Sequence, residues 1–256
     1  MPDQKLKGKV VLMGGGAKNL GGLTSRQFAE LGANVAVHYN SAGTKQAADE
    51  TVAAIKQIGT DAFAIQADLT KVSEVTRTFD ETIKRFGGID IAVNTTGMVI
   101  KKPIMNCTED DYDKIFAVNS KAAFFFVQEA GKKLNDRGKI ISLVSSLLAA
   151  YTDSYAIYPG SKAPIEHFTR AASKEFGARG ISVNALGPGP METPFFYGQE
   201  SAASADYNQN AAALSKFTRT GLTDIADIAP VITFLATDGW WITGQTIFAN
   251  GGYTTR

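Results

Sequence analysis

The sequence has 256 residues, of which 44% are hydrophobic and 20% are charged, which is ordinary for one globular domain with a sizeable core. Its 26 Lys and Arg residues nearly balance its 25 Asp and Glu residues, which excludes the basic surface typical of binding to nucleic acid or anionic membranes. Residues 1–9 are polar and lead directly into the first predicted strand, with no apolar signal region before it. No apolar run is long enough to span a bilayer. The single cysteine, Cys107, agrees with a reducing compartment, so we expect a cytoplasmic protein.

Short runs rich in Val and Ile alternate with longer amphipathic stretches along the chain. We predict strands at residues 10–13, 35–39, 62–67, 89–94, 139–144, 181–186 and 246–249. Helical periodicity predicts helices at residues 23–31, 45–58, 72–86, 110–133, 158–179 and 224–235. This alternation predicts one α/β domain over residues 1–256, a Rossmann-like doubly wound sandwich with a mostly parallel seven-stranded sheet and helices on both faces. Ligands of such sheets bind beyond the carboxyl ends of the strands.

The first predicted strand leads into a glycine-rich turn at residues 14–22, with the sequence GGGAKNLGG. Glycines there let the backbone approach a pyrophosphate, and the following helix N-terminus adds free N–H groups and partial positive charge. No Gly-Lys-Ser/Thr closes the turn, so it is not a nucleoside-triphosphate P-loop. A tight turn without a ligand is the alternative interpretation.

A second pattern is the pair Tyr158 and Lys162, four residues apart in the sequence YPGSK. On a helix these side chains share one face, about 5–6 Å apart at Cβ. A cation so close stabilises tyrosinate and is expected to lower the phenol pKa from its usual value of roughly 10. The pair therefore indicates a general acid/base, and an unrelated pair on a surface helix is the alternative.

These features together resemble the short-chain dehydrogenase/reductase family, over essentially the whole chain. The family turn is Thr-Gly-x-x-x-Gly-x-Gly, and Gly15 and Gly21 match its first and third glycines. Gly14 replaces the family's Thr, and Asn19 replaces its middle glycine. Because Asn tolerates left-handed backbone angles, we expect Asn19 to maintain the turn.

The resemblance implies a catalytic set made of Asn119, Ser145, Tyr158 and Lys162. Ser145 lies thirteen residues before Tyr158, which is the family's usual spacing, and Ser146 is the near competitor. In the implied roles, Tyr158 exchanges a proton with the substrate oxygen and Ser145 hydrogen-bonds that oxygen. Lys162 would bind the nicotinamide ribose, and Asn119 would support a water chain that returns the proton.

The resemblance also implies a nicotinamide dinucleotide, and the end of the second strand indicates NADP(H). An acid there would bind the ribose 2′-OH and repel a 2′-phosphate, but residues 39–41 contain no carboxylate. Lys18 offers a cation for the 2′-phosphate. Further family-like segments follow the third, fourth and sixth strands. The expected cofactor contacts are Gly15, Lys18, Asn19, Leu20, Gly21, Tyr39, Asn40, Ser41, Asp68, Leu69, Asn94, Gly97, Tyr158, Lys162, Pro188, Gly189 and Thr193.

Residues 195–220 break the alternation of strands and helices and predict a mobile substrate lid within the domain. No cluster of Arg or Lys marks a carboxylate or phosphate substrate, so we expect a neutral, hydrophobic ketone or its alcohol. The expected substrate contacts are Met98, Ser145, Leu147, Tyr151, Tyr155, Phe195 and Phe196. The resemblance implies a homodimer or homotetramer.

Two other interpretations remain open. Tyr155 stands seven residues before Lys162, the spacing of enoyl reductases in the family, and a non-catalytic NADP-binding sensor is compatible with the same fold. With only two histidines, the sequence argues against a Ser-His-Asp hydrolase and a His-rich metal site, so we expect no metal. Pro164 lies inside the predicted catalytic helix and cannot donate a hydrogen bond to Gly160, which predicts an irregular helix start.

Overall fold

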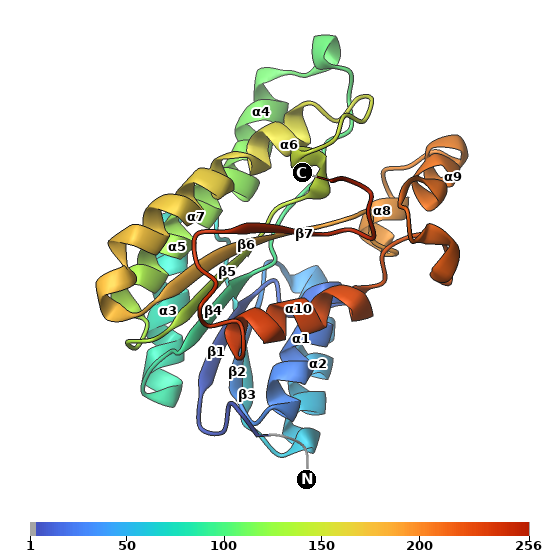
Figure 1. Cartoon of the computed structure of the whole chain (residues 1–256). Coiled ribbons are helices and arrows are strands. Elements are labelled where there is room, and N and C mark those ends of the chain that lie inside the picture. Colours follow the sequence, from blue (N-terminus) through green and yellow to red (C-terminus); the bar gives the residue numbers. More distant parts are fainter. Residues whose placement is uncertain (1–3, 256) are drawn as a thin grey trace.

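A computed structural model describes residues 4–255; residues 1–3 and 256, which the predicted domain includes, lie outside the described residues. All seven predicted strands form, and they pair in one sheet of order β3-β2-β1-β4-β5-β6-β7 (Figure 1). Each pairing is parallel, so the sheet is fully rather than mostly parallel. The strands are β1 (Val10–Gly14), β2 (Asn34–Tyr39), β3 (Ala62–Gln66), β4 (Ile91–Asn94), β5 (Lys139–Leu143), β6 (Ser182–Pro188) and β7 (Thr246–Ala249).

Helices connect the strands and cover both faces of the sheet (Figure 1). Helices α1, α2 and α10 pack together on one face, whereas α3, α5 and α7 pack on the other. The helices are α1 (Asn19–Glu30), α2 (Lys45–Ile58), α3 (Val72–Phe86), α4 (Glu109–Phe116), α5 (Ala122–Lys133), α6 (Ile157–Lys162), α7 (Pro164–Glu175), α8 (Pro194–Tyr197), α9 (Ala202–Ala211) and α10 (Ile225–Ala236).

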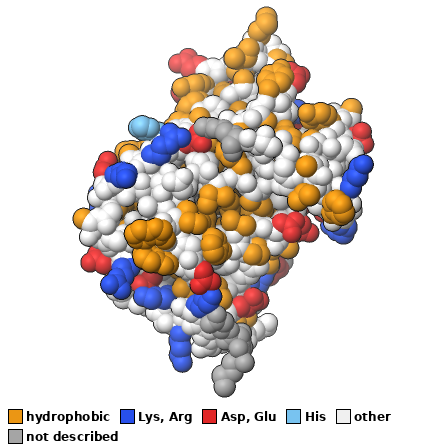
Figure 2. All heavy atoms as spheres, viewed as in Figure 1, with side chains coloured by type: hydrophobic (Ala, Val, Ile, Leu, Met, Phe, Trp, Pro, Cys, Tyr) orange, Lys and Arg blue, Asp and Glu red, His pale blue; other side chains and the backbone are white. Residues whose placement is uncertain are grey.

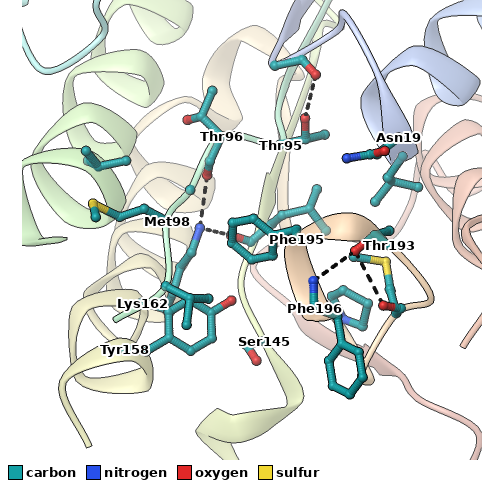
Figure 3. Close-up of a pocket in the computed structure, with 18 of the residues that line it drawn as sticks. Asn19, Thr95, Thr96, Met98, Ser145, Tyr158, Lys162, Thr193, Phe195 and Phe196 are labelled. Carbon is teal, nitrogen blue, oxygen red and sulfur yellow. Dashed lines mark hydrogen bonds between the residues drawn. The ribbon is translucent and has the colours of Figure 1, made fainter. Parts of the chain in front are cut away.

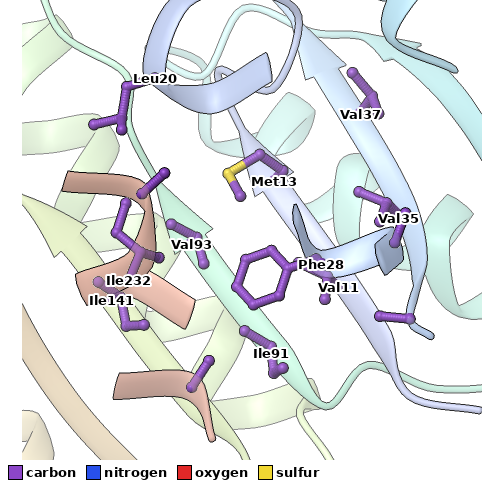
Figure 4. Packing of buried hydrophobic residues seen from close by; sticks show 14 of the residues in the cluster. Val11, Met13, Leu20, Phe28, Val35, Val37, Ile91, Val93, Ile141 and Ile232 are labelled. Carbon is purple, nitrogen blue, oxygen red and sulfur yellow. The ribbon is translucent and has the colours of Figure 1, made fainter. Parts of the chain in front are cut away.

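The central strands are apolar on both faces because each face is covered by helices. Along β1, Val11 and Met13 belong to the core under α1 and α10, whereas Leu12 between them belongs to the core under α3 and α5. Figure 4 shows Phe28 of α1 inserted among the β1, β2 and β4 side chains of the first core. These two cores fix the sheet and therefore the position of every loop at its carboxyl edge.

Two predicted helices are interrupted. The helix predicted at 110–133 forms as α4 and α5, joined by a π-helical turn over Ala117–Lys121. The helix predicted at 158–179 forms as α6 and α7, and the boundary falls at Pro164, which has no N–H to donate. Ala163 keeps helical angles, with φ −55° and ψ −38°, so α7 continues directly from α6.

The face formed by β7 and α10 carries hydrophobic side chains at its surface (Figure 2). Phe234 in α10 is 46% exposed, and Trp240 and Trp241, which connect α10 to β7, are 61% and 81% exposed. Strand β7 is an edge of the sheet, and its four residues are only half-buried. Within residues 4–255, no helix has the length and apolar character needed to cross a membrane.

Candidate active site

A cavity of about 610 Å³ opens at the carboxyl ends of the strands. It lies where the strand order reverses, between β1 and β4, which is where ligands of doubly wound sheets bind. Most of the predicted site residues line it together, although they come from segments far apart in the sequence. These are Gly15, Lys18, Asn19, Leu20, Gly21, Tyr39, Asn40, Asp68, Leu69, Gly97, Met98, Ser145, Leu147, Tyr155, Tyr158, Lys162, Pro188, Gly189, Thr193, Phe195 and Phe196.

Four predicted residues do not line this cavity. Asn94 and Asn119 are buried behind its wall. Ser41 is exposed and precedes the short helix Ala42–Thr44, where its carbonyl accepts a hydrogen bond from Thr44. The structure does not support Tyr151 as a substrate contact, because its loop directs the side chain outward and leaves it 86% exposed.

The glycine-rich turn brings the backbone of residues 15–21 to the cavity wall. Gly15 has φ +77° and Asn19 has φ +50°, so Asn19 adopts the left-handed conformation that the sequence predicted. Helix α1 begins at Asn19, four residues earlier than predicted, and its first turn lines the cavity. At Gly21 an added Cβ would lie 2.0 Å from the Gly15 carbonyl oxygen, which only a glycine avoids. The turn therefore leaves a cradle at a helix N-terminus that suits a pyrophosphate.

His38 supports this turn from β2, a role that the sequence did not reveal. Its Nδ1 accepts a hydrogen bond from the Gly15 N–H at 3.0 Å, so the proton lies on Nε2, which donates to the Ala67 carbonyl at 2.9 Å. Burial lowers the pKa of His38 to about 4, partly opposed by the hydrogen bond to Ala67. The side chain is therefore neutral near pH 7.

The pKa of His38 predicts a loss of stability in mild acid. Between pH 6.5 and 4 the unfolded chain binds a proton that the folded chain excludes, so the free energy of unfolding should fall as the pH drops. The full loss from this group is about 3 kcal/mol. Urea unfolding at pH 7 and pH 4.5 should show a smaller decrease for His38→Asn than for the wild type. Equal decreases in the two proteins would contradict this assignment.

Tyr158 and Lys162 lie on α6 beside the end of β5, and Figure 3 shows Tyr158 and Ser145 next to each other. The Lys162 ammonium is buried and donates to the carbonyls of Thr96 at 3.1 Å and Leu143 at 3.0 Å. Burial lowers the pKa of Lys162 to about 8. The side chain thus bridges the segment after β4 and the end of β5 at the cavity wall.

The expected lowering of the Tyr158 pKa is wrong. Burial raises the pKa of this phenol above its usual value, and interaction with Ser145 opposes the rise only in part. The physical reason is that the Lys162 ammonium is directed toward two backbone carbonyls rather than toward the phenol. Tyr158 is therefore a protonated phenol at neutral pH.

The structure also distinguishes Ser145 from Ser146. The Ser146 hydroxyl donates a hydrogen bond to the Gly187 carbonyl at 3.1 Å and accepts one from the Asn250 amide at 3.0 Å. Its proton and its oxygen are therefore both bonded within the protein. The Ser145 hydroxyl accepts from the Leu147 N–H at 3.2 Å and retains its own proton for a further partner. Ser145 is thus the better candidate to contact a ligand.

Asn119 occupies the π-helical turn between α4 and α5. Its amide donates to the Met98 carbonyl and to the Ser161 hydroxyl, each at 2.9 Å, and its carbonyl accepts from the Met98 N–H at 2.8 Å. These bonds tie the segment after β4 to helix α6. Such single π-turns are frequent at functional sites.

Other cavity residues were not predicted individually. Thr95 and Thr96 lie in the family-like segment after the fourth strand, and Gln199, Glu200 and Asn208 lie in the predicted lid. No sequence motif marks His38, Met191 or Tyr253. Among residues 4–255 no group of three or more His, Cys, Asp or Glu side chains is placed to hold a metal ion.

Comparisons with known proteins agree with this geometry. A family model described as Enoyl-(Acyl carrier protein) reductase matches residues 15–254. A short chain dehydrogenase from Emericella nidulans is 35% identical, with 97% of this chain and 96% of that protein covered. A hydroxynaphthalene reductase-like protein from Metarhizium brunneum is 37% identical, with 98% and 97% covered. The crystal structure of a dehydrogenase from Burkholderia cenocepacia with bound NADP is 61% identical, with 98% and 95% covered and a TM-score of 0.97.

Together with these relatives, the fold and the cavity identify a nicotinamide-dependent oxidoreductase. The chain belongs to the short-chain dehydrogenase/reductase family.

Proposed function

We propose that this chain is an NADP(H)-dependent carbonyl reductase and alcohol dehydrogenase in which Tyr158 is the general acid/base. The main support is the arrangement of Tyr158, Ser145 and Lys162 on one wall of a cavity whose other end is the glycine-rich turn. Bound NADPH would supply the hydride. The NADP in the Burkholderia cenocepacia relative and the reductase names of the fungal relatives support the same function.

The residues around the cavity suit a dinucleotide. The cradle beside Gly21 and the N-terminus of α1 would hold the pyrophosphate, and Asp68 and Leu69 after β3 would lie along the adenine. At the nicotinamide end, Lys162 would bind the ribose. The remaining contacts proposed at that end are Pro188, Gly189 and Thr193.

Preference for NADP(H) is assigned to Lys18, which is exposed at the cavity edge. Lys18→Ala should weaken NADPH binding about tenfold through loss of a charge-assisted contact, while NADH binding changes much less. Isothermal titration of both cofactors would measure this. Lys45→Ala is a matched control, because Lys45 is already paired with Asp49 at 2.5 Å. Equal losses of NADPH and NADH affinity in Lys18→Ala would contradict the assignment.

In the reductive direction Tyr158 would give its proton to the substrate oxygen, and its raised pKa keeps that proton available at neutral pH. Ser145 would donate a hydrogen bond to the same oxygen. Asn119 would hold Met98 and Ser161 in place beside the proton path. Met98, Leu147, Phe195 and Phe196 would give the substrate an apolar surface, which suits a neutral hydrophobic ketone.

The enoyl reductase alternative assigns the proton donor to Tyr155. In the structure, the Tyr155 hydroxyl instead donates to the Glu200 carboxylate, and the side chain is only 7% exposed. That bond favours Tyr158 as the donor. The test is reduction of an α,β-unsaturated ketone with NADPH deuterated at C4 of the nicotinamide. Deuterium on the carbinol carbon supports carbonyl reduction, whereas deuterium on the β-carbon of a saturated ketone supports the alternative.

The lid and the assembly are part of this proposal. We assign residues 195–220 as the substrate lid, because the lid residues Phe195, Phe196, Gln199, Glu200 and Asn208 line the cavity. The apolar face of β7 and α10 supports the predicted homodimer or homotetramer. The cytoplasmic location stays a prediction of the sequence.

A further inference from the structure

Glu200 is a buried acid that the proposed chemistry does not use. It lies on the lid between α8 and α9, and its side chain is 1% exposed. One carboxylate oxygen accepts from the Tyr155 hydroxyl. The other accepts from the Ser204 hydroxyl and from the Lys101 ammonium, the latter at 2.5 Å. We call this group, Glu200, Lys101, Tyr155 and Ser204, the Glu200 lock.

The lock joins three segments that are far apart in the sequence. Lys101 comes from the segment after β4, Tyr155 from the segment before α6, and Glu200 and Ser204 from the lid. The Lys101 ammonium also lies 5.1 Å from the centre of the Tyr155 ring and 3.1 Å from the Ser204 hydroxyl. All the strong contacts of the Glu200 carboxylate therefore cross from the lid to the body of the protein or stabilise the start of α9.

The ion pair with Lys101 stabilises the buried Glu200 carboxylate. Burial alone would raise the pKa of Glu200, but the hydrogen bonds from Lys101, Ser204 and Tyr155 hold it below its usual value. A buried carboxylate that loses its cation must either take up a proton or move into water. Lys101 is thus the partner that permits an ionised Glu200 at this position.

The lock also reaches the catalytic helix. The Tyr155 ring packs edge-on against the Tyr158 ring, with 6.1 Å between ring centres, and the Tyr155 carbonyl accepts a hydrogen bond from the Tyr158 N–H at 3.0 Å. Holding Tyr155 therefore restrains the backbone that carries Tyr158. At the same time Glu200 keeps the lid against the cavity.

We propose that Glu200 is a positioning residue that holds the lid closed over the cavity and thereby selects compact ketones over bulky ones. The size selection rests on the proposed carbonyl reduction, but the closed lid does not. Because Tyr155, Phe196 and Glu200 line the cavity, a bulky ketone would have to break the lock to enter, whereas a small ketone would fit under the closed lid.

The test uses Lys101→Met, which removes the cation and keeps the apolar stem. Glu200 should then be protonated and locked at low pH but ionised and released at high pH. The charged or titratable groups facing it are Lys101, Tyr155 and Tyr253, and burial raises the pKa of both phenols, so neither titrates in this range. Hydrogen–deuterium exchange of the ligand-free protein should show protection factors for residues 195–211 that fall at least about tenfold as the pH is raised across the range from about 5 to about 9. The wild type should show no such fall.

Two further variants make the result specific. Lys101→Met combined with Glu200→Gln replaces the ion pair by a neutral pair, and its lid protection should be independent of pH. Lys102→Met is the matched control, because the neighbouring Lys102 pairs with Asp111 at 2.6 Å and not with the lock. Lid protection in Lys102→Met should equal that of the wild type. If the pH dependence of lid protection is absent from Lys101→Met, or persists in the double variant, the proposed role of the Glu200 lock is wrong.

Steady-state kinetics with ketones of two sizes test the size selection. In Lys101→Met, at the pH where lid protection is lost, the KM for a bulky aryl ketone should fall relative to that for a small cyclic ketone, with kcat for the small ketone changed by less than about threefold. An unchanged KM ratio would overturn the size selection. If no ketone is turned over while the protection factors behave as expected, the closed lid held by Glu200 remains supported and the proposed carbonyl reduction is wrong.

Discussion

Replacing Tyr158 by Phe should lower kcat for ketone reduction by about 10²–10⁴-fold, the usual contribution of a positioned general acid. The ring and its packing remain, and only the proton donor is removed from the wall shared with Ser145. NADPH binding should therefore stay within about threefold of the wild type. Single-turnover kinetics at saturating NADPH, together with a fluorescence titration of the cofactor, would separate the two effects.

Tyr155→Phe is the matched control, because it removes a phenol from the same cavity. Its hydroxyl contacts Glu200 rather than Ser145, so we expect the change mainly in KM. A large loss of kcat in Tyr155→Phe, with near-normal turnover in Tyr158→Phe, would move the proton donor to Tyr155 and favour enoyl reduction.

Gly21→Ala should have the second large effect, on cofactor binding. The added Cβ would lie 2.0 Å from the Gly15 carbonyl oxygen and 2.9 Å from the Thr95 hydroxyl, so the turn must open. We expect NADPH affinity to fall by about 100-fold or more. The free energy of unfolding should fall by about 1–3 kcal/mol, as for other overpacked sites. Calorimetric titration with NADPH and urea unfolding would measure the two changes.

Gly177→Ala provides the comparison, because a Cβ at Gly177 meets nothing within 4 Å. This variant should bind NADPH as the wild type does and should keep its stability. Normal NADPH affinity in Gly21→Ala would remove the glycine-rich turn from the cofactor site.

The strands and the helices between them were predictable because local pattern and tertiary context agree. Helices α2 and α3 begin and end where predicted, and each is followed by a glycine in the left-handed conformation, Gly59 and Gly87. Helix α1 begins earlier than predicted because its first turn includes Gly21 and Gly22, which have low helix propensity. Contact with the Gly15 backbone, rather than propensity, fixes that turn.

The geometry of the candidate site was predictable where it depends on residues close in sequence, and less so elsewhere. The pair Tyr158 and Lys162 follows from helical spacing. In contrast, the partners of Glu200 lie 99 and 45 residues away in the chain, and no periodic pattern marks them. The π-turn that holds Asn119 was also missed, because an extra residue in a helical turn leaves no clear signal in the sequence.

A crystal structure of the protein with NADPH and an unreactive analogue of a ketone would test the central claim most directly. We predict that the analogue's oxygen lies within hydrogen-bond reach, about 2.6–3.2 Å, of both the Tyr158 hydroxyl and the Ser145 hydroxyl, with its carbonyl carbon facing the nicotinamide. An analogue oxygen bound to Tyr155, or a nicotinamide ring outside the cavity that Tyr158 and Lys162 line, would contradict it.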